Sequence, residues 1–138
     1  MATQLGFDLP ARAALGRGDF MVAPSNAVAL AMVENWHKWP LHKLVLTGPP
    51  GAGKTHLAHV WANDSGAHII AASELGASDI TALAQHPVAV EDVDAIAQDT
   101  AAQTALFHLH NILQAAQVPL LMTGTRAPNL WQLSLPDL

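Results

Sequence analysis

The feature that most constrains this chain is a glycine-rich stretch that joins an apolar run at residues 44–46 to a helical pattern at residues 54–62. The stretch fits the pattern G-x-x-x-x-G-K-[ST] of a phosphate-binding loop, and its residues are Gly48, Pro49, Pro50, Gly51, Ala52, Gly53, Lys54 and Thr55. Glycines let backbone N–H groups converge on phosphate oxygens, and the N-terminus of the following helix adds a partial positive charge. We expect Lys54 to reach the β- and γ-phosphates of a nucleotide, and we expect the Thr55 hydroxyl to bind Mg²⁺.

Apolar runs alternate with helical patterns along the rest of the chain. The expected strands are residues 41–47, 67–71, 88–92 and 118–123, and the expected helices are residues 26–38, 54–62, 79–85 and 99–117. Strands that alternate with helices indicate an α/β fold with a parallel sheet. With the phosphate-binding loop, this predicts a P-loop NTPase, a three-layer sandwich around a parallel sheet of about four strands.

Two acidic residues, Glu91 and Asp92, end the expected strand at 88–92. A phosphate-binding loop needs a partner that holds Mg²⁺ and places the attacking water, and an acidic strand end is the usual partner. Glu91 occupies the metal-side position and Asp92 the catalytic position. Mg²⁺ demands near-ideal octahedral placement, so a Glu in place of the usual Asp puts tight metal geometry in question. The alternative is that Glu91, Asp92 and Asp94 form a solvated strand end.

Polar residues also follow the last expected strand. Thr123 and Thr125 lie where a hydroxyl can contact the γ-phosphate or orient the water, and either threonine could serve. We take Thr125 as the candidate catalytic residue. A simple capped strand end is an equally good interpretation.

Residues 1–19 have the pattern of an arm that precedes the domain at 20–138. Leu5, Phe7 and Leu9 alternate along it, which in an extended segment places them on one face. Such a segment can dock three side chains into the pockets of a partner, with Gln4 supplying a hydrogen bond. The alternative is that the arm packs on its own domain.

Composition limits the function classes. The chain has 138 residues, no Cys, a net charge of −5 and only six Lys and Arg. Neutralising phosphates requires clustered cations, so we do not expect direct DNA binding. No apolar run approaches the roughly 18 residues of a membrane span. No secretory signal is visible, so a cytoplasmic location without membrane association is expected.

Four segments together resemble one known family. They are Phe20-Met21-Val22-x-x-Ser25-Asn26, the loop segment extended through His56 and Leu57, Glu91-Asp92, and Thr123-Gly124-Thr125-Arg126-x-Pro128. These segments resemble the AAA+ module of the bacterial DnaA/Hda family, and in particular its short regulatory members. The resemblance implies an AAA+ domain that binds ADP or ATP with Mg²⁺. It adds His56 to the nucleotide-binding residues and places Phe20 and Val22 near the adenine.

The same resemblance implies partners. Gln4-Leu5-Gly6-Phe7-Asp8-Leu9 is similar to the clamp-binding motif Q-L-x-L-x-L of these regulators, with Phe7 replacing a leucine. It implies docking on the sliding clamp of the replicative DNA polymerase and promotion of ATP hydrolysis by DnaA, which switches replication initiation off. The chain itself would be at most a weak ATPase, with ADP as the expected bound nucleotide.

Two other functions stay open. A small P-loop kinase or NTPase would need lid arginines, but Arg12, Arg17 and Arg126 are the only arginines and form no cluster. A helicase-loader-like AAA+ ATPase would handle DNA, which the acidic charge disfavours.

The sequence differs from the family's pattern in one respect that affects the expected function and association. The sequence ends at Leu138, where the family continues with an arginine-finger segment, a fifth strand and a helical lid. Arg126 does not match the finger, so this chain is not expected to activate a partner's ATPase. Without the fifth strand, residues 44–46 are expected at an exposed sheet edge, which invites a homodimer or aggregation.

Overall fold

A computed structural model describes residues 21–22, 26–49 and 53–125. The strands are β1 Met21–Val22, β2 Lys43–Thr47, β3 His68–Ala71, β4 Val88–Glu91 and β5 Leu120–Gly124. The α-helices are α2 Asn26–Glu34, α3 Lys54–Ser65, α4 Ile80–Leu83 and α5 Thr100–Ala116. Short 3₁₀ helices are η1 Trp36–Lys38, η2 Pro40–His42, η3 Ala72–Ala77 and η4 Val93–Ile96.

The described strands form one parallel sheet in the order β1-β2-β5-β4-β3. This confirms the expected parallel α/β fold. β1 was not predicted, because a strand of two residues shows no periodicity. It pairs with Leu46 and Thr47 of β2, so a short strand covers part of the edge that was expected to be exposed.

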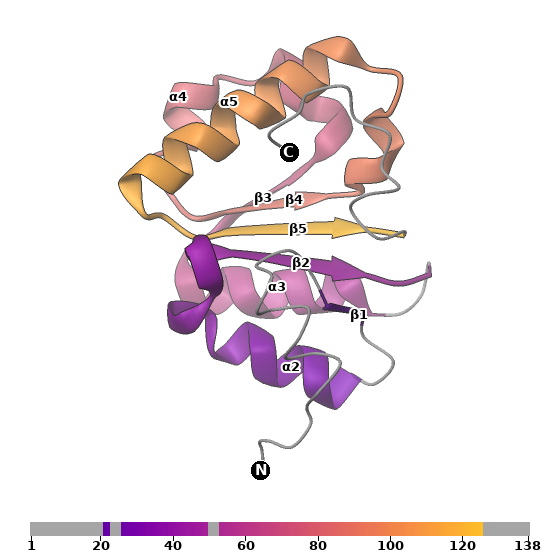
Figure 1. Cartoon of the computed structure of the whole chain (residues 1–138), viewed down its shortest axis with the longest axis vertical. Coiled ribbons are helices and arrows are strands. Elements are labelled where there is room, and N and C mark those ends of the chain that lie inside the picture. Colours follow the sequence, from indigo (N-terminus) through magenta and orange to yellow (C-terminus); the bar gives the residue numbers. More distant parts are fainter. Residues whose placement is uncertain (1–20, 23–25, 50–52, 126–138) are drawn as a thin grey trace.

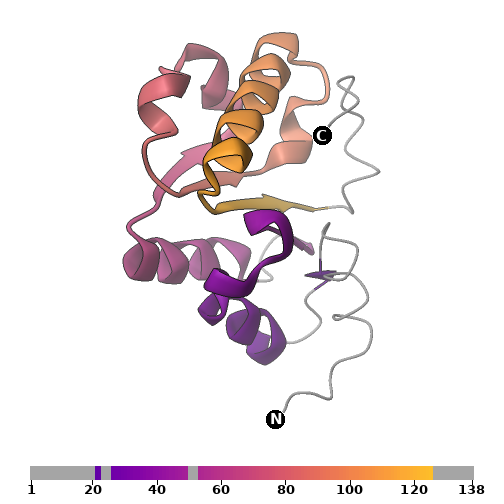
Figure 2. The same cartoon turned by 60° about the vertical axis from the view of Figure 1, so that its left-hand side comes forward.

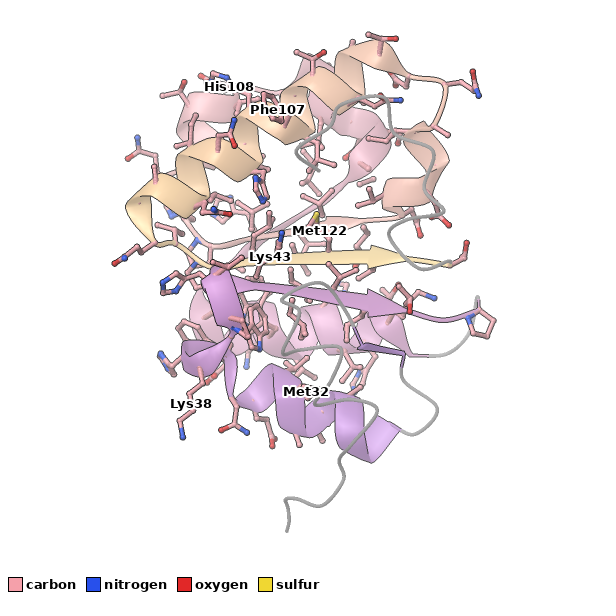
Figure 3. The ribbon with its side chains drawn as sticks, viewed as in Figure 1. Met32, Lys38, Lys43, Phe107, His108 and Met122 are labelled. Atoms are coloured by element: carbon pink, nitrogen blue, oxygen red, sulfur yellow. The ribbon has the colours of Figure 1, made fainter. Side chains whose placement is uncertain are left out.

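Helices cover both faces of the sheet. α2 and α3 lie on one side, and α4 and α5 lie on the other (Figures 1 and 2). Each layer has its own core: one joins the sheet to α5, η3 and η4, and the other joins it to α2 and α3. Met122 of β5 belongs to the first core and Met32 of α2 to the second (Figure 3). The molecule therefore has the three layers that the sequence predicted.

Two conformational features fix the helix that follows the phosphate-binding loop. Gly53 adopts the left-handed region at its start, with φ of 90°. Gly66 adopts the same region at its end, where its N–H bonds to the Ala62 carbonyl. A side chain is strained in this region, so glycine at these positions lets the helix begin and end cleanly.

The helix expected over residues 26–38 ends earlier, at Glu34, and continues as two 3₁₀ turns. The indole of Trp39 explains part of this break, because its Nε1 donates to the Met32 carbonyl at 2.8 Å in a buried position. Pro40 then starts η2, and Leu41 has a left-handed φ of 55°. The strand β2 therefore starts at Lys43 rather than at residue 41.

Tryptophans join α2 and η1 to α3. The ring of Trp61 on α3 is fully buried, 5.2 Å from the ring of Trp39 and 6.5 Å from that of Trp36. The Trp36 Nε1 donates to Asp64 at 2.8 Å. These contacts tie the N-terminal helix to the helix that carries Lys54.

None of the helices in the described ranges is both long and apolar enough to cross a membrane.

Candidate nucleotide site

The phosphate-binding loop leaves the sheet at the end of β2, the strand between β1 and β5. Gly48 follows β2, and its N–H donates to the Gly124 carbonyl at the end of β5, at 3.2 Å. Gly53 starts α3, where the Leu57 N–H donates to the Gly53 carbonyl at 3.0 Å. The strand and the helix expected on either side of the motif are confirmed. Pro50, Gly51 and Ala52 lie outside the described residues.

Lys54 is 8% exposed, and its ammonium group folds back onto the loop. Its Nζ donates to the carbonyls of Gly48 and Pro49, the latter at 2.9 Å. These bonds satisfy a buried cation. Phosphate oxygens make stronger, charge-assisted bonds, so they can replace the carbonyls as acceptors. Thr55 and His56 are both exposed in the first turn of α3.

The acidic strand end is held in a specific conformation. Asp92 has a left-handed φ of 61°, and its N–H donates to the buried Thr123 Oγ1 at 3.1 Å. The threonine at the end of β5 therefore positions the turn that carries Asp92. The Asp92 carboxylate itself is exposed.

Glu91 is half-buried, and its Oε2 is a buried atom without a hydrogen-bond partner among the described residues. A buried carboxylate oxygen without a donor is costly unless something positive meets it. Mg²⁺ prefers carboxylate and hydroxyl oxygens, so Glu91 and Thr55 fit the ion expected with a bound nucleotide. No group of three or more potential metal-binding side chains occurs in the described segments, so such an ion would need ligands from the nucleotide or water.

Thr125 has a partner that the sequence did not indicate. Its N–H donates to Asp94 Oδ2 at 3.0 Å, and its hydroxyl donates to the same oxygen. Asp94 was considered only as part of a solvated strand end. The two residues are 31 positions apart, so no local pattern could have paired them.

Strand register brings these groups together at the carboxyl ends of the strands. Thr47 lies opposite Gly124 across β2 and β5, and Val90 lies opposite Met122 across β4 and β5. The carboxyl ends of parallel strands lie on the same side of the sheet, and ligands of open α/β sheets bind there. The loop, the acidic end and Thr125 therefore come from three adjacent strands.

The remaining predicted site residues belong to the N-terminal segment of the chain. Gln4, Leu5, Phe7, Leu9 and Phe20 lie outside the described residues, and Val22 is described only as part of β1.

Fold and loop together define the chain as a P-loop NTPase of the AAA+ type. Residues 44–135, about two thirds of the chain, match the family described as "ATPase family associated with various cellular activities (AAA)". The chain belongs to this family. No curated protein sequence matches it significantly.

Solved structures of DnaA share the fold. AMPPCP-bound DnaA from Aquifex aeolicus superposes with a TM-score of 0.68 at 16% identity, over 81% of this chain and 42% of that chain. Replication initiator DnaA bound to AMPPCP and single-stranded DNA gives 0.67 at 17% identity, over 81% and 41%. Domain III of Thermotoga maritima DnaA gives 0.65 at 20% identity, over 81% and 57%. This chain thus spans roughly half the length of these proteins or less.

Proposed function

We propose that this chain is a nucleotide-binding regulator of DNA replication initiation, of the Hda type. In this proposal it binds ADP or ATP with Mg²⁺ and docks on the sliding clamp through its N-terminal arm, as the nucleotide-binding part of a regulator that promotes hydrolysis of DnaA-bound ATP. Since Arg126 does not match the arginine finger, the finger itself is not assigned to residues 1–138. The observation that carries the nucleotide part is the convergence of the phosphate-binding loop with the unpartnered, buried oxygen of Glu91. The DnaA-like fold and the arm motif support the regulatory part.

Each residue has a defined task in this proposal. Lys54 exchanges the carbonyls of Gly48 and Pro49 for phosphate oxygens, and the N-terminus of α3 stabilises the phosphate charge. Thr55 and Glu91 would hold Mg²⁺, which would neutralise charge on the phosphates. Asp92 is exposed on a turn that Thr123 fixes, so it is available to orient a water molecule.

The nucleotide part is tested by calorimetric titration of ADP and of ATP, with Mg²⁺, into wild type, Lys54→Ala and Lys54→Met. Lys54→Met keeps the buried aliphatic stem and removes the charge. We expect the wild type to bind and both variants to lose roughly tenfold or more in affinity, because hydrogen bonds to charged groups are strong. Lys38→Met removes an exposed lysine from η1 and is the matched control. Equal binding by wild type and Lys54→Met would contradict the proposed site.

The clamp part is tested by pull-down with purified sliding clamp. We expect the wild type to be retained and the Gln4→Ala/Leu5→Ala variant to be lost, because both side chains belong to the recognition motif. Asp8→Ala changes the same segment at a position that the motif leaves free. Equal retention of wild type and the double variant would remove clamp docking from the proposal.

The effect on DnaA is measured as phosphate release from DnaA·ATP in the presence of loaded clamp and this chain, and we expect no acceleration because no arginine of the chain matches the arginine finger. A parallel titration with single-stranded DNA at several salt concentrations distinguishes a regulator from a DNA-handling ATPase, since binding through phosphates weakens steeply with salt. Salt-dependent DNA binding by a chain that the clamp does not retain would favour the helicase-loader-like alternative.

A further inference from the structure

The link between Asp94 and Thr125 connects two elements of the candidate site. Asp94 lies on η4, directly after the acidic strand end, and Thr125 directly follows β5. One carboxylate oxygen of Asp94 accepts both the Thr125 N–H and the Thr125 hydroxyl. Hydrogen bonds to an ionised acceptor are about twice as strong as neutral ones, so this link fixes the position of Thr125.

The surrounding structure holds Asp94 in place. Gln103 on α5 is 2% exposed, and its Nε2 donates to the carbonyls of Ile96 at 2.8 Å and Ala97 at 2.9 Å. On the other side of η4, the Asp92 N–H is bonded to Thr123. The element that carries Asp94 is therefore bound to α5 and to β5, and the contact with Thr125 follows from the packing of η4.

The link determines which hydrogen-bond donors the site offers to a phosphate. A threonine hydroxyl has one proton to donate, and that of Thr125 goes to Asp94. Within the described ranges, Lys54 is the lysine at the carboxyl ends of the strands. The other two lysines lie toward the amino end of β2: Lys38 is in η1, before the strand, and Lys43 is its first residue (Figure 3).

A third phosphate group would add negative charge close to the acidic strand end. Glu91, Asp92 and Asp94 already place three carboxylates within four residues there. The loop and α3 offer donors to the phosphates that ADP and ATP share, whereas the Thr125 hydroxyl, which would be a donor to the additional phosphate of ATP, is bonded to Asp94.

We propose that Asp94 is a positioning residue that withholds the Thr125 hydroxyl from the γ-phosphate and so makes the site selective for ADP over ATP. This inference rests on the proposed nucleotide site. It assigns to Asp94 a role through Thr125 and no contact with the nucleotide.

The test is calorimetric titration of ADP and of the non-hydrolysable analogue AMPPCP, both with Mg²⁺, into five proteins. They are wild type, Asp94→Ala, Asp94→Asn, Thr125→Val and the double variant Asp94→Ala/Thr125→Val. We expect Asp94→Ala to raise AMPPCP affinity relative to ADP by about tenfold, the scale of one hydrogen bond to a charged group. We expect a smaller gain for Asp94→Asn, because an amide oxygen still accepts from Thr125.

The double variant separates the hydroxyl from simple charge removal. If Asp94 acts through Thr125, Asp94→Ala gives no gain when it is introduced into Thr125→Val. A gain that persists in that background, or an Asp94→Asn gain as large as that of Asp94→Ala, would mean that only charge matters and would overturn the inference.

A matched control is Asp79→Ala, which removes an exposed carboxylate that caps α4 through the Ala82 N–H. We expect it to leave the ADP-to-AMPPCP ratio unchanged. Binding by the wild type with an unchanged ratio in Asp94→Ala overturns this inference alone. Failure of the wild type to bind either nucleotide overturns the proposed nucleotide site as well.

Discussion

Leu41 combines two unfavourable properties in one residue. It has a left-handed backbone with φ of 55°, and it is 58% exposed, the one large hydrophobic residue so exposed in the described segments. The left-handed conformation costs an L-residue roughly 1–2 kcal/mol, and glycine adopts it without that cost. We therefore expect Leu41→Gly to raise the free energy of unfolding by about 1 kcal/mol, measured by urea denaturation.

Two substitutions show whether backbone strain is the cause. Gln117, the C-cap of α5, also has a left-handed φ of 59°, so Gln117→Gly is expected to stabilise as well. Ala115→Gly, at an exposed helical position of α5, is expected to cost roughly 0.5–1 kcal/mol. A loss of stability in Leu41→Gly similar to that in Ala115→Gly would show that position 41 is unstrained.

Among the elements, η4 depends on one buried side chain of α5. Gln103→Leu removes the donor to the carbonyls of Ile96 and Ala97 while keeping an apolar side chain of similar size. Buried acceptors left without a donor cost roughly 1–3 kcal/mol, so we expect about 2 kcal/mol of lost unfolding free energy by urea denaturation. Gln114→Leu, at an exposed position of the same helix, is the control, with an expected change within roughly 0.5 kcal/mol. Equal effects of the two would show that the Gln103 bonds contribute nothing.

The sequence predicts elements where the signal is local. The loop pattern identified the junction of β2 and α3, and the spacing of Leu106, Leu109 and Leu113 predicted α5, whose buried face contains all three. Contacts that depend on strand register leave no such local pattern in the sequence. The bond of Thr123 to Asp92 and that of Thr125 to Asp94 each span 31 positions, and they exist because β4 and β5 are neighbours. The assigned roles of Asp92 and Thr125 stay predictions.

At the scale of the whole molecule, the edge of the sheet beside β2 bears on association. β1 pairs with Leu46 and Thr47, and within the described segments no strand pairs with residues 43–45 on that side. An apolar edge of this kind favours pairing with another chain. We expect an apparent mass that rises with concentration in static light scattering. A constant monomer mass up to the highest soluble concentration would contradict this prediction.

The tryptophan contacts between the N-terminal helix and α3 have an optical consequence. The chain has four Trp and no Tyr, so its near-ultraviolet absorbance and emission come almost entirely from indoles. Two of these rings lie against the ring of Trp61 on α3, with centroid separations of 5.2 Å for Trp39 and 6.5 Å for Trp36. At such distances indoles couple electronically, and their coupling changes with ring orientation. The helix that begins at Lys54 thus carries an intrinsic chromophore, and any tilt of that helix changes the near-ultraviolet dichroism of the unlabelled protein.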